Sequence, residues 1–279
     1  RDWSSDVCSS DLMMVQVRSY GDGLRLVLSQ DVTERERAEA MRRDFVANVS
    51  HEIRTPLTVL CGFIETLGSL PLTDVERKRV IDLMSQQADR MQSLVSDLLT
   101  LAQIEGSPRP PLDRWFKVQG MLTRVEADGK ALSRGRHAIT LEVQGDAQNL
   151  GFCDIAGTEG EWLSAMGNLV SNAVRYTPED KGITIRWSMQ DDGSAEFSVQ
   201  DGGIGIAPEH LPRLTERFYR VDGSRSRETG GTGLGLSIVK HVVQRHGGEL
   251  RIESEPGKGS LFTLTVPANR VRQRLAEAA

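Results

Sequence analysis

The stretch Met41-Arg-Arg-Asp-Phe-Val-Ala-Asn-Val-Ser-His-Glu-Ile-Arg-Thr-Pro-Leu57 repeats an apolar residue every four positions. Such spacing places side chains on one face of a helix. We therefore predict a long helix, which Thr33 and Glu36 open with the spacing of a capping box. The pattern continues past the quoted stretch, and its apolar positions are Met41, Phe45, Val49, Ile53, Leu57, Leu60, Ile64 and Leu67.

A second helix is predicted after residues 68–72, where a proline interrupts the pattern. Thr73 and Glu76 repeat the capping-box spacing. Steps of four and three alternate along this helix, which indicates a heptad seam, at Val80, Met84, Gln87, Met91, Leu94, Leu98 and Leu101. Two helices joined by a short turn form an antiparallel hairpin. Because a lone hairpin leaves its apolar stripes in water, we expect a homodimer in which two hairpins form a four-helix bundle.

His51 lies two positions from core residues on either side, so at 100° per residue it points away from the seam and into solvent. One nitrogen of a neutral imidazole is free to attack phosphorus. Glu52 could hydrogen-bond the other nitrogen, and Thr55 shares the face of His51 and could hold a water in line with a phosphoryl group. Pro56 removes a helix hydrogen bond, which predicts a bend here. Taken alone, a histidine beside a glutamate on a helix surface is far more often a solvated face than a catalytic site.

Residues 106–112 are rich in proline and form a stiff linker. Beyond it, periods of helix and strand alternate. We predict helices at 118–132, 161–176 and 236–246, and strands at 139–143, 183–189, 196–200, 249–253 and 261–266. Helices on one face of a largely antiparallel sheet make an α+β domain. The chain is therefore expected to be multidomain, as its 279 residues also indicate.

Four sequence elements of this second domain suit a nucleotide. Asn168 and Asn172 lie one helical turn apart, and their amide oxygens suit Mg²⁺, while Arg175, before Tyr176, can meet phosphate oxygens. Helix-surface asparagines are the simpler alternative. Asp201 ends a strand and can accept a hydrogen bond from an exocyclic amine such as that of adenine.

Glycines surround these groups. Gly203 and Gly205 follow Asp201 and let the backbone approach a base. The third element, 230–236, leads directly into a helix and forms an anion cradle that fits a di- or triphosphate. Its residues include Gly231, Gly233, Gly235 and Leu236. The polar segment 217–229, which contains Arg220, Arg225 and Arg227, is predicted to be a lid over the phosphates, although a solvated loop would have the same composition.

Composition excludes several other classes of protein. A net charge of −5 argues against nucleic acid as the main partner. Cys8, Cys61 and Cys153 are odd in number and far apart, which supports neither a disulfide framework nor a zinc site and indicates a reducing compartment. No apolar run approaches the roughly 18 residues of a membrane span, so we expect this fragment to be soluble.

The N-terminal residues fall into two parts. Residues 13–33 predict two strands around a glycine turn, the end of a truncated domain. Residues 1–12 have no period or cap and correspond, in one choice of codons, to a common sequencing adapter. We interpret them as an assembly artefact and expect the natural protein to continue upstream with other sequence.

Taken together, the motifs resemble those of the sensor histidine kinases of two-component systems. The run 51–56 resembles their H box, 168–177 the N box, 201–205 the G1 box, Phe218 the F box and 231–236 the G2 box. The stretches 42–51 and 211–222 resemble most the phosphate-regulon branch of proteobacteria, in which Thr215 replaces a common phenylalanine. Gly202 stands where asparagine is usual, and Ser260 replaces a common threonine.

The resemblance implies a phosphoacceptor and dimerisation domain at 34–105, a linker at 106–112, a Bergerat-type ATP-binding sandwich at 113–267 and a tail at 268–279. It implies a protein histidine kinase that uses ATP and Mg²⁺, with Asn172 on the metal, Asp201 on adenine and His51 as phosphoacceptor. The phosphoryl group would pass to an aspartate of a response regulator, and Thr55 would act in its hydrolysis, in phosphate-starvation signalling.

The resemblance also identifies residues 13–33 as the end of a PAS-like sensor domain, preceded by a membrane anchor at the cytoplasmic face of the bacterial inner membrane. Two other functions were weighed. A related ATPase that drives conformational change would not need His51 and Thr55 on a dimerising hairpin. A scaffold or phosphatase-only protein would not need the intact Asn172, Asp201 and G2-box glycines.

Overall fold

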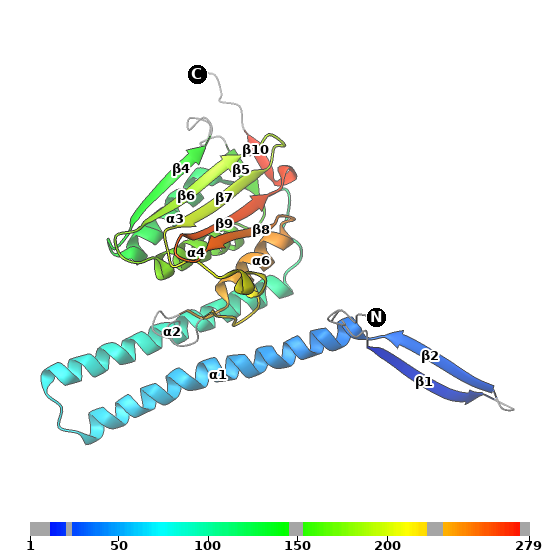
Figure 1. Cartoon of the computed structure of the whole chain (residues 1–279), viewed down its shortest axis with the longest axis horizontal. Helices are drawn as coiled ribbons and strands as arrows, with labels where there is room; N and C mark the ends of the chain where they lie inside the picture. The colour runs from blue at the N-terminus through cyan, green and yellow to red at the C-terminus, as the bar shows by residue number, and fades with distance from the viewer. Residues whose placement is uncertain (1–11, 21–23, 145–152, 222–230, 274–279) are drawn as a thin grey trace, which may run out of the picture. The chain divides into compact units, whose positions relative to one another are not determined.

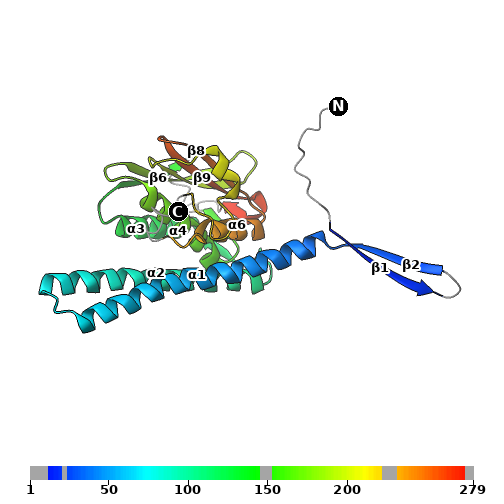
Figure 2. The same cartoon turned by 60° about the horizontal axis from the view of Figure 1, so that its bottom comes forward.

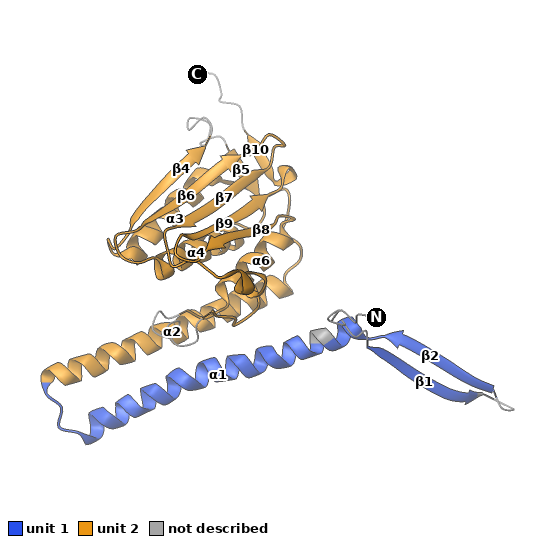
Figure 3. Cartoon of the chain, in the orientation of Figure 1, with its two compact units in different colours: residues 1–73 blue, residues 74–279 orange. Residues whose placement is uncertain are grey.

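The computed structural model describes residues 12–20, 24–144, 153–221 and 231–273. The chain divides into two compact units, residues Arg1–Thr73 and Asp74–Ala279 (Figure 3). The interpretation of residues 1–12 as an artefact falls almost entirely outside the described residues, which begin at Leu12.

The first unit consists of a strand pair and one helix. Strands β1 (Met13–Tyr20) and β2 (Leu24–Asp31) pair antiparallel, with Met13 opposite Asp31, so the two strands expected here are confirmed. The glycine turn at 21–23 lies outside the described residues. Helix α1 (Thr33–Ser69) follows and runs for 37 residues with Pro56 inside it (Figure 1).

The capping box predicted at Thr33 and Glu36 is wrong. The N-cap residue is Val32, whose side chain makes no capping hydrogen bond. Thr33 is the first helical residue, and its hydroxyl oxygen accepts a hydrogen bond from the Leu12 amide at 2.7 Å. Its own amide is bonded to the Asp31 carboxylate at 2.9 Å. The Thr33 hydroxyl is therefore used to hold the strand that enters the hairpin rather than to cap α1.

The second unit begins with helix α2 (Asp74–Gly106), separated from α1 by residues 70–73. Its start at Asp74 agrees with the helix predicted after Thr73. The C-terminal half of α2 packs on the domain that follows, because Leu94, Leu101 and Ile104 are only 2–3% exposed. The C-terminal part of the heptad stripe on α2 thus packs against the following domain within the same unit.

The following domain contains a five-stranded sheet covered by helices. The sheet has the order β4-β6-β7-β9-β8, and only β4 and β6 are parallel. Its strands are β4 (Ala138–Gln144), β6 (Gly182–Met189), β7 (Ala195–Asp201), β8 (Leu250–Glu255) and β9 (Gly259–Val266). Helices α3 (Val118–Ser133), α4 (Glu159–Tyr176) and α6 (Gly235–Arg245) cover one face (Figure 2). The predicted helices, strands and α+β architecture are confirmed.

The core between these layers is apolar and closely filled. The strands alternate inward and outward residues, and the helices carry apolar stripes, as their sequence periods require. The largest side chains buried here, each at most 1% exposed, include Trp162, Leu169, Ile183, Ile185, Trp187, Phe197 and Leu234. The sheet and helices therefore form a rigid support for the residues at their edges.

A second, three-stranded sheet is absent from the sequence prediction. Its order is β10-β5-β3, with β3 (Trp115–Lys117), β5 (Cys153–Ala156) and β10 (Val271–Gln273). A short 3₁₀ helix, η3 (Ala268–Arg270), leads into β10. Folded elements therefore continue past residue 267, where the tail was expected to begin.

Two arginines fix the linker to the domain that follows it. The buried guanidinium of Arg270 donates to the carbonyl oxygens of Pro110 and Pro111, both at 3.0 Å, and of His246 at 2.7 Å. Arg245, at the end of α6, donates to the carbonyls of Ile104, Ser107 and Pro108. We call the segment 104–111, held in this way, the strapped linker.

Two further sequence expectations concern cysteines and membranes. Cys61 and Cys153, the cysteines in the described part of the chain, are both free thiols. Among the described helices, none is both long and apolar enough to cross a membrane.

Candidate functional site

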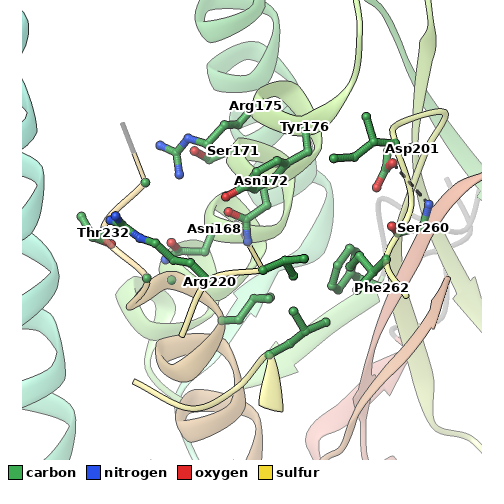
Figure 4. A pocket seen from close by; sticks show the side chains of 18 of the residues that line it. Asn168, Ser171, Asn172, Arg175, Tyr176, Asp201, Arg220, Thr232, Ser260 and Phe262 are labelled. Atoms are coloured by element: carbon green, nitrogen blue, oxygen red, sulfur yellow. Dashed lines mark hydrogen bonds between the residues drawn. The ribbon is translucent and has the colours of Figure 1, made fainter. Parts of the chain in front are cut away.

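A cavity of about 530 Å³ lies beside the C-terminal half of α4 (Figure 4). Cavities of this size hold small ligands of nucleotide dimensions. Its walls come from α4, from the end of β7 and the loop after it, from residues 214–221, from the loop 231–236, from β9 and from α2. Most of the nucleotide-site residues predicted from the sequence line it, namely Asn168, Asn172, Arg175, Tyr176, Asp201, Gly205, Arg220, Gly231, Gly233, Gly235 and Leu236.

Asp201 forms the deep end of the cavity. The residue is 6% exposed, and Oδ1 accepts hydrogen bonds from the amides of Gly203 at 2.8 Å and Ser260 at 3.3 Å (Figure 4). Burial raises the pKa of Asp201, and the two amides oppose that shift. Among the described residues, none bonds to Oδ2. This oxygen is an acceptor suited to the amino group of a ligand.

Ser260 adds a second acceptor beside Asp201. The Ser254 hydroxyl donates to the Gly259 carbonyl at 2.9 Å and accepts from the Ile206 amide at 2.8 Å. Its single proton is thus used, so the 2.9 Å contact between the Ser254 and Ser260 hydroxyls requires Ser260 to donate. The Ser260 oxygen can then only accept from a ligand. Two acceptors side by side match an amino group, which has two N–H donors.

The glycines after Asp201 are required by close backbone packing. Gly205 has φ +68°, and a Cβ there would lie 2.0 Å from the carbonyl oxygen of Glu255. Gly203 does not line the cavity itself. A Cβ on Gly203 would lie 2.6 Å from Asp201 Oδ1 and 2.7 Å from the Tyr176 carbonyl oxygen. Gly203 therefore allows its amide to reach the Asp201 carboxylate.

Helix α4 presents a polar face to the cavity. Asn168, Ser171, Asn172 and Arg175 project from successive turns (Figure 4). The amide nitrogen of Asn168 donates to the Ser164 carbonyl at 2.9 Å, which leaves its Oδ1 oxygen directed toward Gly235. Side-chain amide oxygens of this kind are suitable ligands for Mg²⁺.

The glycines of the loop 231–235 lie so close to neighbouring groups that an added side chain would require those groups to shift. A Cβ on Gly231 would lie 3.2 Å from Arg175 Nη1, and one on Gly235 2.6 Å from Asn168 Oδ1. Gly233 has φ +74° and faces Phe218. The loop leads into α6, whose N-cap residue Leu234 makes no side-chain capping hydrogen bond, and the amides of such a first helical turn can bind an anion.

Residues 214–221 contribute an aromatic wall. Tyr219 and Leu214 line the cavity, and the Tyr219 hydroxyl lies 2.8 Å from His210 Nδ1. The Arg213 guanidinium stacks on the Tyr219 ring, 4.3 Å from its centroid. Arg220 lines the cavity as predicted. Residues 222–229 of the proposed lid, including Arg225 and Arg227, lie outside the described residues.

Helix α2 supplies a wall that sequence reasoning did not foresee. Ser93 and Asp97 line the cavity, and the Thr232 hydroxyl donates to Asp97 Oδ2 at 2.6 Å. Sequence reasoning also missed Ser171, Thr177, Pro178, Ile204, Ile206, Leu214, Tyr219, Val221, Thr232 and Phe262. Several of these are neighbours of predicted residues, so helical spacing from Asn168 would have identified Ser171. Asp97 is not near any predicted site residue in the sequence, so neither spacing nor a motif identifies it.

The three residues of the predicted phosphoacceptor site lie in the other unit. His51 and Thr55 are exposed, as the helical register predicted, and Glu52 is half-buried. The Thr55 hydroxyl donates to the carbonyl oxygen of His51 at 3.1 Å. This bond places the Thr55 side chain one turn from His51 on the same face of α1.

Two family models match the chain. One, the His Kinase A (phospho-acceptor) domain, covers residues 41–107, and the other, the histidine kinase-, DNA gyrase B- and HSP90-like ATPase, covers residues 158–270. The chain thus belongs to the sensor histidine kinase family, with a helical phosphoacceptor region followed by an α/β ATPase domain.

Curated relatives sharpen this assignment. The chain is 50% identical over 254 residues to the phosphate regulon sensor protein PhoR of Pseudomonas aeruginosa, covering 90% of this chain and 56% of PhoR. It is 38% identical to PhoR of Haemophilus influenzae, covering 91% of this chain and 58% of that protein. To the sensor-like histidine kinase SenX3 of Mycolicibacterium smegmatis it is 39% identical, over 87% of this chain and 62% of SenX3. The chain therefore spans somewhat over half the length of these relatives.

Solved structures of histidine kinases share the fold. Full-length ShkA in complex with AMPPNP matches with a TM-score of 0.57 and 29% identity, over 84% of this chain and 47% of ShkA. The Acinetobacter baumannii histidine kinase AdeS matches with a TM-score of 0.58 at 22% identity, over 79% of this chain and 98% of that one. The latter likeness concerns the fold alone.

Proposed function

We propose that this chain transfers the terminal phosphoryl group of ATP to His51 and then to an aspartate of a response regulator. The observation that carries the proposal is the cavity around Asp201, which joins a paired acceptor for an amino group to a helix N-terminus for phosphates. The family assignment supports ATP as the ligand.

Each wall of the cavity then has a role. Asp201 and Ser260 accept from the adenine amino group, and Gly203 and Gly205 let the backbone approach the ring. Tyr176 contacts the nucleotide from the end of α4. The loop containing Gly231, Gly233, Gly235 and Leu236 surrounds the phosphates with backbone amides. Arg175 and Arg220 neutralise phosphate charge.

The residues present also fit Mg²⁺. Asn172, one helical turn from Asn168, offers an amide oxygen within the same cavity. The Asn168 oxygen lies next to Gly235, where the phosphate-binding helix starts. We propose that Asn172 ligates the ion and that Asn168 assists. When bound, the ion supplies charge neutralisation on the phosphate oxygens.

His51 acts as the nucleophile. A ring nitrogen forms the bond to the γ-phosphorus, the bond from that phosphorus to the bridging oxygen breaks, and ADP leaves with the electron pair. Glu52 stabilises the positive charge that the imidazole gains. In the phosphatase activity, which removes the phosphoryl group from the regulator, Thr55 positions a water that hydrolyses the aspartyl phosphate. Its place one turn from His51 supports this assignment.

The wider setting is also part of the proposal. Residues 34–105 form a dimerisation and phosphoacceptor domain that assembles with a second copy as a four-helix bundle, and residues 113–267 form the core of the catalytic domain. Residues 13–33 end a PAS-like domain, and a membrane anchor precedes it at the cytoplasmic face of the inner membrane. Similarity to PhoR supports a role in phosphate-starvation signalling.

Radiolabelling tests the central step. The protein is incubated with γ-labelled ATP and Mg²⁺, and the labelled protein is then treated with acid and with base. We expect label that acid removes and base does not, and none in His51→Gln. Equal label in His51→Gln, or no label in protein that binds ATP, would exclude the phosphoacceptor role and favour a plain ATPase or a phosphatase-only protein.

A second variant separates the two activities. Thr55→Ala should keep autophosphorylation on His51 and lose hydrolysis of the phosphorylated regulator, because only the latter needs the positioned water. Thr58→Ala is a matched control, since its exposed hydroxyl makes the same type of bond to a helix carbonyl. Equal loss of both activities in Thr55→Ala would reject a separate role for Thr55.

A further inference from the structure

Helix α2 places a carboxylate inside the nucleotide cavity. Asp97 Oδ2 accepts a hydrogen bond of 2.6 Å from the hydroxyl of Thr232, which lies between two glycines of the phosphate-binding loop. Asp97 and Arg175 line the same cavity, and their charges interact. An acidic side chain therefore lies at the end of the cavity where the loop and α6 offer their amides to phosphates.

The Thr232 hydroxyl is fully used in this arrangement. Its oxygen accepts from the Leu234 amide at 3.2 Å, while its only proton goes to Asp97. A phosphate oxygen needs a donor, so it would have to displace the Asp97 carboxylate to bond this hydroxyl. Asp97 competes with phosphate both for the hydroxyl and for the charge of Arg175.

Other contacts hold α2 in this position. Glu105, two turns further along α2, forms an ion pair with Arg217. Arg245 bonds the carbonyl oxygen of Ile104, and Leu94 and Leu101 are buried on the same side of the helix. The Asp97 carboxylate is thus one of several contacts along one face of α2 rather than an isolated side chain. Burial raises its pKa, and the Thr232 bond and the Arg175 charge counter this shift.

We propose that Asp97 is a selectivity residue of the nucleotide site, which makes the site favour ADP over ATP while α2 lies against the phosphate-binding loop. The proposal rests on the proposed binding of ATP in this cavity. The carboxylate repels the more highly charged triphosphate more strongly than the diphosphate, since Coulomb energy scales with the product of the charges. Linkage is reciprocal, so ATP binding also weakens the contact of α2 with Thr232.

The test measures nucleotide affinities of the whole chain by calorimetry with Mg²⁺. In Asp97→Asn, which removes the charge and keeps the shape, we expect the affinity for a non-hydrolysable ATP analogue to rise about tenfold and that for ADP to rise about threefold or less. Raising the salt concentration should reduce the difference from wild type. Adenosine, which carries no phosphate, should bind both proteins equally.

Asp82→Asn is the matched control, because it removes a carboxylate from an exposed position of the same helix outside the cavity. It should leave all three affinities unchanged. An unchanged ratio of ATP-analogue to ADP affinity in Asp97→Asn would overturn the proposal, as would an equal rise for adenosine. Failure of the wild-type protein to bind any adenine nucleotide would instead overturn the proposed function.

Discussion

The backbone amide of Phe218 donates to the carbonyl oxygen of Gly233 at 2.8 Å, which joins residues 217–221, the described part of the predicted lid, to the glycine-rich loop 231–235. Both residues have left-handed backbone angles, φ +64° for Phe218 and φ +74° for Gly233. A non-glycine residue rarely adopts this conformation, and surrounding contacts must hold it there. The two segments that border the phosphate end of the cavity are therefore positioned by one another.

Gly233→Ala should abolish nucleotide binding. An alanine Cβ would lie 2.8 Å from the Phe218 Cα, which forces the two segments apart. Gly257→Ala is the control, because Gly257 has a similar φ of +79° but nothing within 4 Å of the added carbon. Both variants carry a backbone cost of roughly 1–2 kcal/mol. Calorimetry with an ATP analogue should therefore separate them, and equal weakening in both would refute the steric argument.

Ser254→Ala should reduce discrimination between bases. Without Ser254, the Ser260 hydroxyl can turn its proton toward the cavity and donate to a carbonyl group. We expect the preference for ATP over inosine triphosphate, whose base carries a carbonyl in place of the amino group, to fall about tenfold, the order of one hydrogen bond. Competition binding measures this ratio. As a control, Thr265→Val removes a hydroxyl elsewhere on β9 and should leave this ratio unchanged. If Ser254→Ala weakens the binding of ATP and of inosine triphosphate equally, Ser254 has only a structural role.

Stability should fall with acidification because of His246. Its ring is 1% exposed, and Nδ1 bonds the Val242 carbonyl at 2.8 Å. Burial lowers the pKa of His246 to about 4. An unfolded histidine titrates near pH 6.5, so between these values the unfolded chain binds more protons. The free energy of unfolding should drop by roughly 3 kcal/mol as pH falls from about 6.5 to 4, with no such effect above 6.5.

Urea unfolding between pH 7.5 and 4.5 checks this expectation. His246→Gln should be less stable at pH 7.5, since it loses the contact with Trp162, whose ring centroid lies 4.3 Å away, but its stability should depend less on pH. The exposed His51→Gln should retain the wild-type pH dependence. The same slope in His246→Gln as in wild type would assign the acid sensitivity to other groups.

Arg270→Ala should destabilise the catalytic domain by about 3 kcal/mol, because three carbonyl oxygens lose a charged donor in a buried site. Arg251→Ala, which breaks an exposed ion pair with Glu196, should cost less than 1 kcal/mol. The urea concentrations at the midpoint of unfolding measure the loss of stability in both variants. Limited proteolysis gives a second readout: cleavage between residues 106 and 112 should accelerate only in Arg270→Ala, and equal rates in both variants would show that the linker is held by other means.

The long elements were predictable because their periods extend over many residues. The stripe of α1 and the alternation of β6 and β9 each give several matches to one template. The strands β3 and β10 have three residues each, too few to show a period, and all four residues of β5 are buried, so they do not alternate. Thr33 failed as a cap because a distant amide, that of Leu12, used its hydroxyl.

The cavity was predictable to the extent that its residues form local motifs. Asp201 with its glycines and Asn168 with Asn172 lie within single turns or loops, where spacing implies proximity. Asp97 and Thr232 are 135 positions apart. Their meeting depends on how α2 packs against α6, and nothing in either neighbourhood records it. Tertiary packing alone placed this carboxylate in the cavity.

The strapped linker connects the end of α2 rigidly to the domain that contains the cavity. Five carbonyl oxygens of residues 104–111 are fixed by Arg245 and Arg270, so the backbone there cannot swivel without breaking charged hydrogen bonds. Torsion applied to the last turns of α2 would therefore turn the cavity with it instead of being absorbed by the proline-rich segment. A small rotation at the end of α2 would therefore be expected to shift the residues that line the cavity rather than to bend residues 104–111.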